Sequence, residues 1–545
     1  MSIQVRYKNF DQLSFADLLV YSKLPPHPFW SNVESKIDFS FADKLCAVLY
    51  TGMGQHPYAP SLKLKIHLVQ SYCSLSDRLV EEKIIADLFI KRFLQLPVDF
   101  FGFDHSTIGL DRTRMGVVMF RACHLYILAQ MYQHGLWGDK SERWIIDSFP
   151  SNIHMPRRGA YRLIQHATIR LVQHLRKRAP KQVQKAAQYL ALDALNIRLG
   201  HNAETADQLL AFSKLVAQAY GLLQWFENEN VKPLLAEWKD YEQSQQLQLI
   251  LIRILEENSR PIDPSDGEIS EQTADVQFEK IPRGERPKGR IESAVDPQAR
   301  TALKRSKPTV GYKTQNLCTT GGVVLDARTI PANEHDQDAT ADMVSTLQHF
   351  FSRSPAALLG DAAYGYAKHR VLLAGQGIHV VAPVAPTSNS TGLIPISAFT
   401  YDAQRDLFIC PAGEQSTRKI HNAGLEGTQY RFTKGTCQSC PLQTQCTKNA
   451  DRSVFRSDYA NIYEQAKAYN DSLSGKADLQ KRYVVERKNN ELKNHCGLGL
   501  ANTRSRASLQ LKALCAAMVV NLKHTVRMLA NPSPGFLRYA RKAPA

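Results

Sequence analysis

No stretch of the 545-residue sequence stays apolar over the ~18–20 residues that a membrane-spanning helix needs. The first residues, MSIQVRYKNFDQLSF, lack the apolar core of a signal peptide. We therefore expect a cytoplasmic protein without a membrane partner. The chain also lacks internal repeats. Its length exceeds what one compact core supports, and a usual size of roughly 100–200 residues per domain predicts three or four structural units.

Acidic residues are the minority charge. Asp and Glu total 51 against 68 Lys and Arg, which gives a net charge of +17. This excess favours a nucleic-acid partner over a basic surface that only keeps the protein soluble. Residues 148–192 contain no acid but many basic residues, among them Arg157, Arg158 and Arg162. Because these have no acidic partners in the same helices, we expect phosphate contacts rather than a solvated helix face.

The apolar patterning divides the chain into two parts. Residues 1–135 have helical spacing without a clear strand and predict a helical N-terminal domain. Residues 140–545 predict an α/β domain, interrupted by a basic helical insertion with a polar linker at 152–307 and by a segment with four cysteines at 400–450. The expected order is strand, insertion, a two-stranded hairpin, helix, strand, helix and strand, followed by two C-terminal helices. This order predicts a mixed sheet with helices packed on it.

Two aspartates each follow a short apolar run. Asp147 follows residues 144–146, and residues 148–150 should end that strand; Asp361 follows residues 357–360. If the two strands are parallel neighbours, both carboxylates lie at one sheet edge, where ligands of α/β sheets commonly bind. Close carboxylates repel each other unless a cation binds, and oxygen ligands favour Mg²⁺ or Mn²⁺. Two such ions about 3.5–4 Å apart support phosphoryl transfer. For either aspartate alone, the alternative is a turn former or a helix cap.

A third carboxylate is expected from the first C-terminal helix, at 456–495. Arg482, Glu486 and Lys493 are four and seven residues apart, so on a continuous α-helix they share one face. An acid between two cations suits a metal ligand flanked by phosphate-binding groups. Glu491 is the competing acid, and it points elsewhere if Arg482 and Lys493 define the face. A surface ion pair is the alternative role for Glu486.

Four of the ten cysteines lie close together in the sequence. Cys410, Cys437, Cys440 and Cys446 have the spacing C-x26-C-x2-C-x5-C, which suits a structural Zn²⁺ site in a reducing compartment. Four protein ligands leave no open position for a substrate. We expect the ion to stabilise a small, loop-rich segment that lacks a core of its own. Four unrelated thiols are the alternative.

Motifs along nearly the whole chain follow the order found in one family. They are residues 58–60, 75–78, 93–97 and 104–107 in the helical part, and residues 146–148, 311–313, 330–336 and 360–365 with Arg482, Glu486 and Lys493 in the α/β part. The chain thereby resembles the DDE transposases of bacterial insertion sequences. In particular, it resembles the branch with a tyrosine–arginine–glutamate–lysine signature on the last catalytic helix. The signature tyrosine would fall at Leu479, where this sequence departs from the pattern.

The resemblance implies a ribonuclease-H-like core preceded by a helical domain that binds DNA ends. Asp147, Asp361 and Glu486 would bind two Mg²⁺ or Mn²⁺ ions, and Arg482 and Lys493 would hold DNA phosphates. The implied activity is cut-and-paste transposition, in which water cleaves the transposon end and the freed 3′-hydroxyl attacks target DNA. In relatives with the signature, a hairpin intermediate frees the second strand. The implied partners are the terminal inverted repeats, target DNA and a second copy of the chain, in the nucleoid region of a bacterial cytoplasm.

Two other functions compete with an active transposase. A DNA-binding protein could have kept the fold and lost catalysis, but the three intact carboxylates favour the enzyme. A zinc hydrolase acting at the cysteines is disfavoured, because four thiolates leave no open coordination position.

Overall fold

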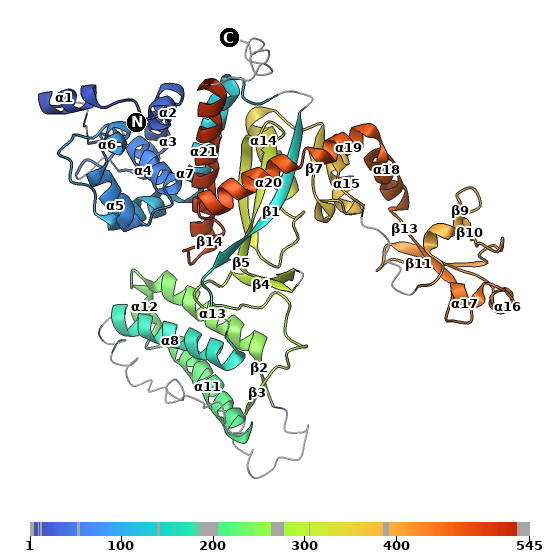
Figure 1. The fold of residues 1–545 in the computed structure, drawn as a ribbon. Helices are drawn as coiled ribbons and strands as arrows, with labels where there is room; N and C mark the ends of the chain where they lie inside the picture. Colours follow the sequence, from blue (N-terminus) through green and yellow to red (C-terminus); the bar gives the residue numbers. More distant parts are fainter. Residues whose placement is uncertain are drawn as a thin grey trace.

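The computed structural model describes residues 5–530 except 9, 11–12, 52–54, 139–141, 157, 180, 182–183, 185–204, 263–276, 305 and 385–391. Figure 1 shows a central sheet with three bodies around it: the N-terminal helices, a helical insertion, and a small segment of short strands and helices. None of the described helices is long and apolar enough to cross a membrane.

The N-terminal part is helical, as the sequence predicts. Its helices are α1 (Phe15–Lys23), α2 (Trp30–Lys36), α3 (Phe41–Leu45), η1 (Ala47–Leu49), α4 (Pro60–Tyr72), α5 (Asp77–Ala86), α6 (Leu88–Leu94) and α7 (His105–Gln133). Polar side chains fix where two of them begin. Ser76 accepts a hydrogen bond from the backbone N–H of Leu79 at the start of α5, and Asp104 accepts one from Ser106 at the start of α7.

A seven-stranded mixed sheet forms the centre of the molecule (Figure 1). Its strands are β1 (Arg143–Ile153), β4 (Arg300–Lys304), β5 (Lys307–Thr319), β6 (Val324–Pro331), β7 (Ala357–Leu359), β8 (His379–Val381) and β14 (Leu500–Ala501). The order is β4-β5-β1-β7-β8, with β6 paired to β5 and β14 paired to β1. β5 is antiparallel to β1 and β6, whereas β7 is parallel to β1 and β8. The expected hairpin, and the parallel pairing of the strands beside the two aspartates, are confirmed.

The first strand is longer than the sequence indicates. β1 continues through residues 148–150, which were expected to end it, so Asp147 lies inside the strand and not at its end. Pro150 lies opposite Lys313 of β5, while β7 pairs with β1 at residues 143–145. Beyond that point the described strands leave one side of β1 open until β14 begins. A proline is tolerated on such an open strand, because it has no N–H to offer a second neighbour.

Side chains of β1 alternate between the two faces of the sheet. Trp144 and Ile146 belong to the large core that includes α14 (Thr340–Phe351) and α15 (Ala367–Ala374). Ile145 points to the other face and packs with Val484 and Val485 of α20 (Tyr483–Asn490). Because side chains alternate with a period of two, Asp147 lies on the same face as Ile145, beneath α20.

The expected single helix at 456–495 is broken into α18 (Ala460–Asp471), α19 (Leu473–Gln480), α20 and a π-helical turn, η4 (Glu491–His495). Ser472 causes the first break, because its hydroxyl caps α19 by accepting the N–H of Gly475. Just before α20, the buried Asp478 forms an ion pair with Arg143 of β1 (Oδ1 to Nε, 2.6 Å). β14, which follows η4, pairs with the far end of β1. The α20 segment is therefore attached to one strand at both of its ends.

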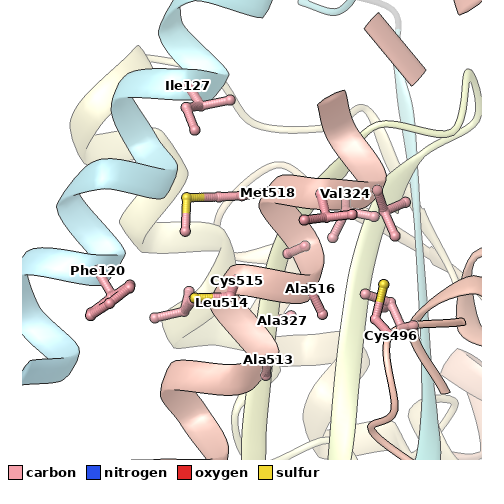
Figure 2. Close-up of a cluster of buried hydrophobic side chains, with 14 of the residues drawn as sticks. Phe120, Ile127, Val324, Ala327, Cys496, Ala513, Leu514, Cys515, Ala516 and Met518 are labelled. Atoms are coloured by element: carbon pink, nitrogen blue, oxygen red, sulfur yellow. The ribbon is translucent and has the colours of Figure 1, made fainter. Parts of the chain in front are cut away.

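The last helix, α21 (Arg506–Ala530), joins the sheet to the N-terminal helices. Figure 2 shows Leu514 and Met518 of α21 between Phe120 of α7 and Val324 of β6. All of them belong to one hydrophobic core that extends from the N-terminal helices into the sheet. The N-terminal part thus shares its core with the sheet.

Two amide side chains of α21 hydrogen-bond to the backbone of β6, which pairs with β5 along its other edge. Asn521 Nδ2 donates to the carbonyl of Val324, and Asn521 Oδ1 accepts from the N–H of Val324, both at 2.8 Å. Gln510 accepts from the N–H of Thr329 (2.8 Å) and donates to the carbonyl of Ala327 (2.7 Å). These amides satisfy backbone groups that a further strand would otherwise satisfy.

The insertion after β1 has its own hydrophobic core. It contains α8 (Ala160–Arg178), α11 (Thr205–Phe226), α12 (Lys232–Ala236) and α13 (Tyr241–Asn258), followed by the paired strands β2 (Ser259–Pro261) and β3 (Phe278–Lys280). Apolar residues of α8, α11 and α13 pack together, apart from the core of the sheet. The central sheet resumes at β4, inside the range expected for the insertion.

The cysteine segment also has a core, contrary to our expectation of a segment without one. Its elements are η3 (Ile396–Ala398), β9 (Thr400–Asp402), β10 (Leu407–Ile409), β11 (Arg418–Asn422), β12 (Gly427–Arg431), α16 (Lys434–Gln438), α17 (Gln443–Cys446) and β13 (Ser453–Ser457). Phe399, Phe408, Tyr430, Phe432 and Val454 are buried together. β13 completes a three-stranded sheet with β11 and β12, so the segment extends beyond residue 450.

Burial of His67 predicts acid sensitivity of the helical part. His67 of α4 is buried against the ring of Phe120, 5.2 Å away, and burial lowers its pKa to about 4. An unfolded chain, with a histidine pKa near 6.5, binds the proton more readily, so stability falls as pH drops below about 6.5. Between pH 7 and pH 5 this histidine alone costs about 2 kcal/mol of unfolding free energy. Urea titrations at pH 7 and pH 5 measure how much unfolding free energy is lost between the two pH values. This loss should be smaller in His67→Leu than in the parent, and it should be unchanged in the exposed control His56→Leu.

Loss of an α21 amide should destabilise the fold. Asn521→Ala leaves a buried N–H and a buried carbonyl of Val324 without partners, at roughly 1–3 kcal/mol each. We expect a loss of about 2–6 kcal/mol in unfolding free energy, measured by denaturant titration. The exposed Asn502→Ala should change little. Equal stability of the two variants would contradict a structural role for the amide.

Candidate active site

The register between β1 and β7 brings two aspartates to one level of the sheet. Ile145 of β1 lies beside Leu359 of β7 in the parallel pair. Asp147 comes two residues after Ile145, and Asp361 comes two residues after Leu359. Both aspartates therefore lie just beyond the last residue pair, at the same end of the paired strands. The sequence expected this neighbourhood, although it placed Asp147 at a strand end.

Asp147 is a partly buried carboxylate without a cationic hydrogen-bond partner among the described residues. Burial raises its pKa to about 6, and the negative charges of Asp361 and Asp336 add to the rise. A hydrogen bond from the backbone N–H of Ser148 and the nearby guanidinium of Arg482 act in the opposite direction. The local excess of negative charge is therefore only partly compensated by the protein.

Asp361 begins the short helix η2 (Ala362–Tyr364), and its Oδ1 accepts the N–H of Ala363 at 2.9 Å. Asp361 therefore has the helix-capping role that the sequence left open as an alternative. The cap engages Oδ1 and leaves Oδ2 outside this hydrogen bond. Tyr364 folds back against Gly360, where an added Cβ would lie 2.8 Å from the Tyr364 Cβ. Glycine at this position therefore lets the tyrosine ring pack beneath the aspartates. Burial beside Asp336, Asp147 and Asp361 keeps the pKa of Tyr364 well above its usual value.

Helix α20 crosses over β1 (Figure 1), and Asn489, not Glu486, contacts Asp147. Asn489 Nδ2 donates to Asp147 Oδ2 at 2.9 Å, and Asn489 Oδ1 accepts from Asn316 Nδ2 at 3.0 Å. Glu486 is exposed one turn earlier on the same helix. Arg482 faces the site closely enough to lower the pKa of Asp147.

The other predicted residues of this helix have different surroundings. Glu491 accepts a hydrogen bond from Lys488 Nζ at 2.9 Å, so it is engaged in an ion pair within the segment. Lys493 is exposed, but it lies in the π-helical turn. The seven-residue spacing from Glu486 to Lys493 is therefore not that of a continuous α-helix, which corrects the assumption of one shared α-helical face. Leu479 packs against the core between α20 and the sheet.

The sequence interpretation missed Asp336 and Asn489. Asp336 follows β6 on a loop, forms an ion pair with Lys313 of β5 (2.6 Å) and acts on the pKa of Asp147. Asn489 is a polar residue four positions after Val485, within the stripe of α20 that faces the sheet. A buried polar residue in an apolar stripe was the available signal for Asn489, because such residues need a hydrogen-bond partner.

The donor chemistry of the site fits a divalent cation. Oxygen ligands from Asp147 and Asp361, with Asp336 nearby, carry charge that the protein only partly balances. As arranged here, no three His, Cys, Asp or Glu side chains of the described residues are placed to bind one metal ion. Glu486 would complete a set of three only by reaching inward from its exposed position.

Helix α8, which carries Arg162, lies apart from α20 in the sequence and in the fold (Figure 1). Arg158 lines a pocket with His154, Thr503 and Arg504. Arg162 is exposed on α8 and donates to Gln165 Oε1 at 3.1 Å. Arg157 lies outside the described residues.

The four clustered cysteines face one pocket. Cys410, Cys437, Cys440 and Cys446 all line it, together with Phe399 and Phe432. Burial raises the pKa of Cys446, the other three thiols add to the rise, and Arg452 opposes it. The four cysteines thus share one pocket, but no three of them are placed to bind one metal ion as arranged in the described part of the chain.

Comparison with known families gives two matches. A model described as "Transposase DDE domain" matches residues 287–522, which include Asp361 and Glu486. A model described as "Transposase domain (DUF772)" matches residues 19–114, within the N-terminal helices. Comparisons with curated proteins and with solved structures returned no match. The two family matches lie in the order expected from the sequence motifs, and the chain belongs to the insertion-sequence DDE transposases.

Proposed function

We propose that this transposase carries out cut-and-paste transposition by metal-dependent phosphodiester hydrolysis and strand transfer at the ends of an insertion sequence. The observation that carries the proposal is the pairing of β1 with β7, which brings Asp147 and Asp361 to one level of the sheet. The strand order β6-β5-β1-β7-β8, with three antiparallel strands followed by two parallel ones, supports a ribonuclease-H-like core.

In this proposal Asp147, Asp361 and Glu486 would hold two Mg²⁺ or Mn²⁺ ions. When bound, such ions lower the pKa of water and stabilise the attacking and leaving oxygens. Asp147 and Asp361 would approach the ions from the sheet, and Glu486 would have to reach inward from the exposed side of α20. Arg482, already beside Asp147, would hold a DNA phosphate at the site, and the exposed Lys493 would hold another.

The proposed substrate is double-stranded DNA, comprising the terminal inverted repeats and the target. The net charge of +17 and the bases Arg158 and Arg162 favour phosphate contacts. Two copies of the chain would pair two DNA ends. The N-terminal helices would bind the ends, and their common core with the sheet would hold them in place relative to the carboxylates.

We also propose that the four cysteines bind a structural Zn²⁺ ion. The proposal is supported by the four-cysteine spacing and by the single pocket that all four side chains line, and it requires the thiols to move closer together when the ion binds. The ion would stabilise the loops between β10 and α17, next to the small core of this segment. Four thiolate ligands would leave no open coordination position on the zinc ion, so DNA cleavage would take place at the carboxylates.

Substitution of the carboxylates tests the catalytic proposal. Asp147→Asn, Asp361→Asn and Glu486→Gln should each slow Mg²⁺-dependent cleavage of DNA that carries the element's ends by about 1,000-fold, because several kcal/mol of transition-state stabilisation depend on the metal. The matched control Glu491→Gln, which keeps its hydrogen bond to Lys488, should cleave like the parent. Retained DNA binding by the slow variants would separate lost catalysis from lost affinity.

Distinct results would contradict distinct parts of this proposal. A parent protein that binds the DNA ends and never cuts them would favour the inactive DNA-binding alternative. Normal cleavage by Glu486→Gln would remove that residue from the metal site. Cleavage that survives loss of all three carboxylates would favour chemistry at the cysteines.

Metal analysis tests the zinc proposal. The purified chain should contain about one Zn²⁺ per molecule by mass spectrometry of the metal, as expected for a four-thiolate site. Cys440→Ser should lose the zinc and make the segment after residue 400 more sensitive to proteolysis. Cys73→Ser, far from the pocket, is the control and should keep it. A parent protein without zinc after purification in reducing, metal-replete buffer would contradict the proposal.

A further inference from the structure

We propose that Asn489 is a positioning residue that orients Asp147 for metal binding, an inference that rests on the function proposed above. Asn489 bridges α20 and β1 through its contact with Asp147 Oδ2 at 2.9 Å. It is itself buried, although it belongs to a helix whose neighbouring residues Glu486 and Asn490 are exposed.

The hydrogen bonds around Asn489 have one consistent direction. A carboxylate only accepts, so the amide nitrogen of Asn489 must face Asp147. Its amide oxygen then faces Asn316 and requires a donor there, which the Nδ2 of Asn316 supplies at 3.0 Å. Asn316 lies opposite Asp147 in the β1–β5 pair. Three side chains from three elements thus form a chain of hydrogen bonds that gives each amide one defined orientation, and Asn316 Oδ1 at its end is buried without a hydrogen-bond partner among the described residues.

This arrangement leaves part of Asp147 available to a cation. Asn489 occupies Oδ2, and the backbone N–H of Ser148 supplies a second hydrogen bond to the carboxylate. A carboxylate held in this way cannot rotate freely about its Cβ–Cγ bond, so its remaining lone pairs keep one direction. Groups that hydrogen-bond to a metal ligand typically contribute a factor of about 10–100 in metal affinity or activity.

An apolar side chain at position 489 would remove the orientation without removing a metal ligand. Asn489→Leu has nearly the same size, and it leaves Asp147 Oδ2 and the amide of Asn316 without this partner. Helix α20 would still be held by Val484 and Val485 and by its attachments to β1. The expected effect is therefore on the metal and only weakly on the fold.

Mn²⁺ binding to the full-length chain tests the inference. By titration calorimetry without DNA, Asn489→Leu should bind Mn²⁺ about 10–100-fold more weakly than the parent. The matched control Asn490→Leu, at the exposed neighbouring position, should bind like the parent. In DNA cleavage, Asn489→Leu should need correspondingly more Mn²⁺ and recover most of the parental rate at saturation. Asn489→Ala gives the same readout should the leucine variant not fold.

The outcomes separate this inference from the function on which it rests. A folded Asn489 variant that binds Mn²⁺ as tightly as the parent, while Asp147→Asn does not bind, overturns the positioning role alone. A parent whose Mn²⁺ binding is absent, or is unaffected by Asp147→Asn, overturns the proposed metal site and this inference together. Weaker binding in Asn489→Leu with normal binding in Asn490→Leu supports it.

Discussion

The parallel pairing of β1 with β7 is the constraint on which the candidate site depends. Three residue pairs fix the register of the two strands, and this register determines the relative positions of the aspartates that follow. A shift of one residue would turn one carboxylate to the opposite face of the sheet, because side chains alternate along a strand. The buried residues around this pairing, including Ile145 and Leu359, therefore specify where negative charge accumulates as well as how the sheet packs.

Two helices from the C-terminal part, α20 and α21, hydrogen-bond to the sheet through amide side chains. Asn521 and Gln510 of α21 bind backbone groups of β6, and Asn489 of α20 binds a side chain of β1. Amides are suited to this task, because one group supplies both a donor and an acceptor and carries no charge that burial would penalise. The first two contacts stabilise a sheet edge, whereas the third meets a carboxylate in the candidate site.

Much of the architecture could be predicted from the sequence. The hairpin of β5 and β6 and the neighbouring positions of Asp147 and Asp361 follow from apolar runs and turn residues. The length of β1 could not be predicted, because Pro150 normally ends a strand and is tolerated here where one side of β1 is open. The π-helical turn and the hydrogen-bond partner of Asn489 depend on tertiary packing. The periodicity of apolar residues in the sequence does not predict such contacts.

The attachment of α20 to β1 at both ends has a mechanical consequence. The Arg143–Asp478 ion pair holds the chain before the helix, and the pairing of β14 with β1 holds the chain after it. Helix and strand therefore form a closed loop of contacts that contains Asp147 and Glu486. Asp361 follows the neighbouring strand β7, and the basic insertion and the cysteine segment lie outside the loop (Figure 1). The basic insertion and the cysteine segment each have a hydrophobic core of their own, so neither core contributes to the contacts between α20 and β1. The geometry of the candidate site thus depends on β1, β7 and α20, and not on the two bodies attached to the sheet.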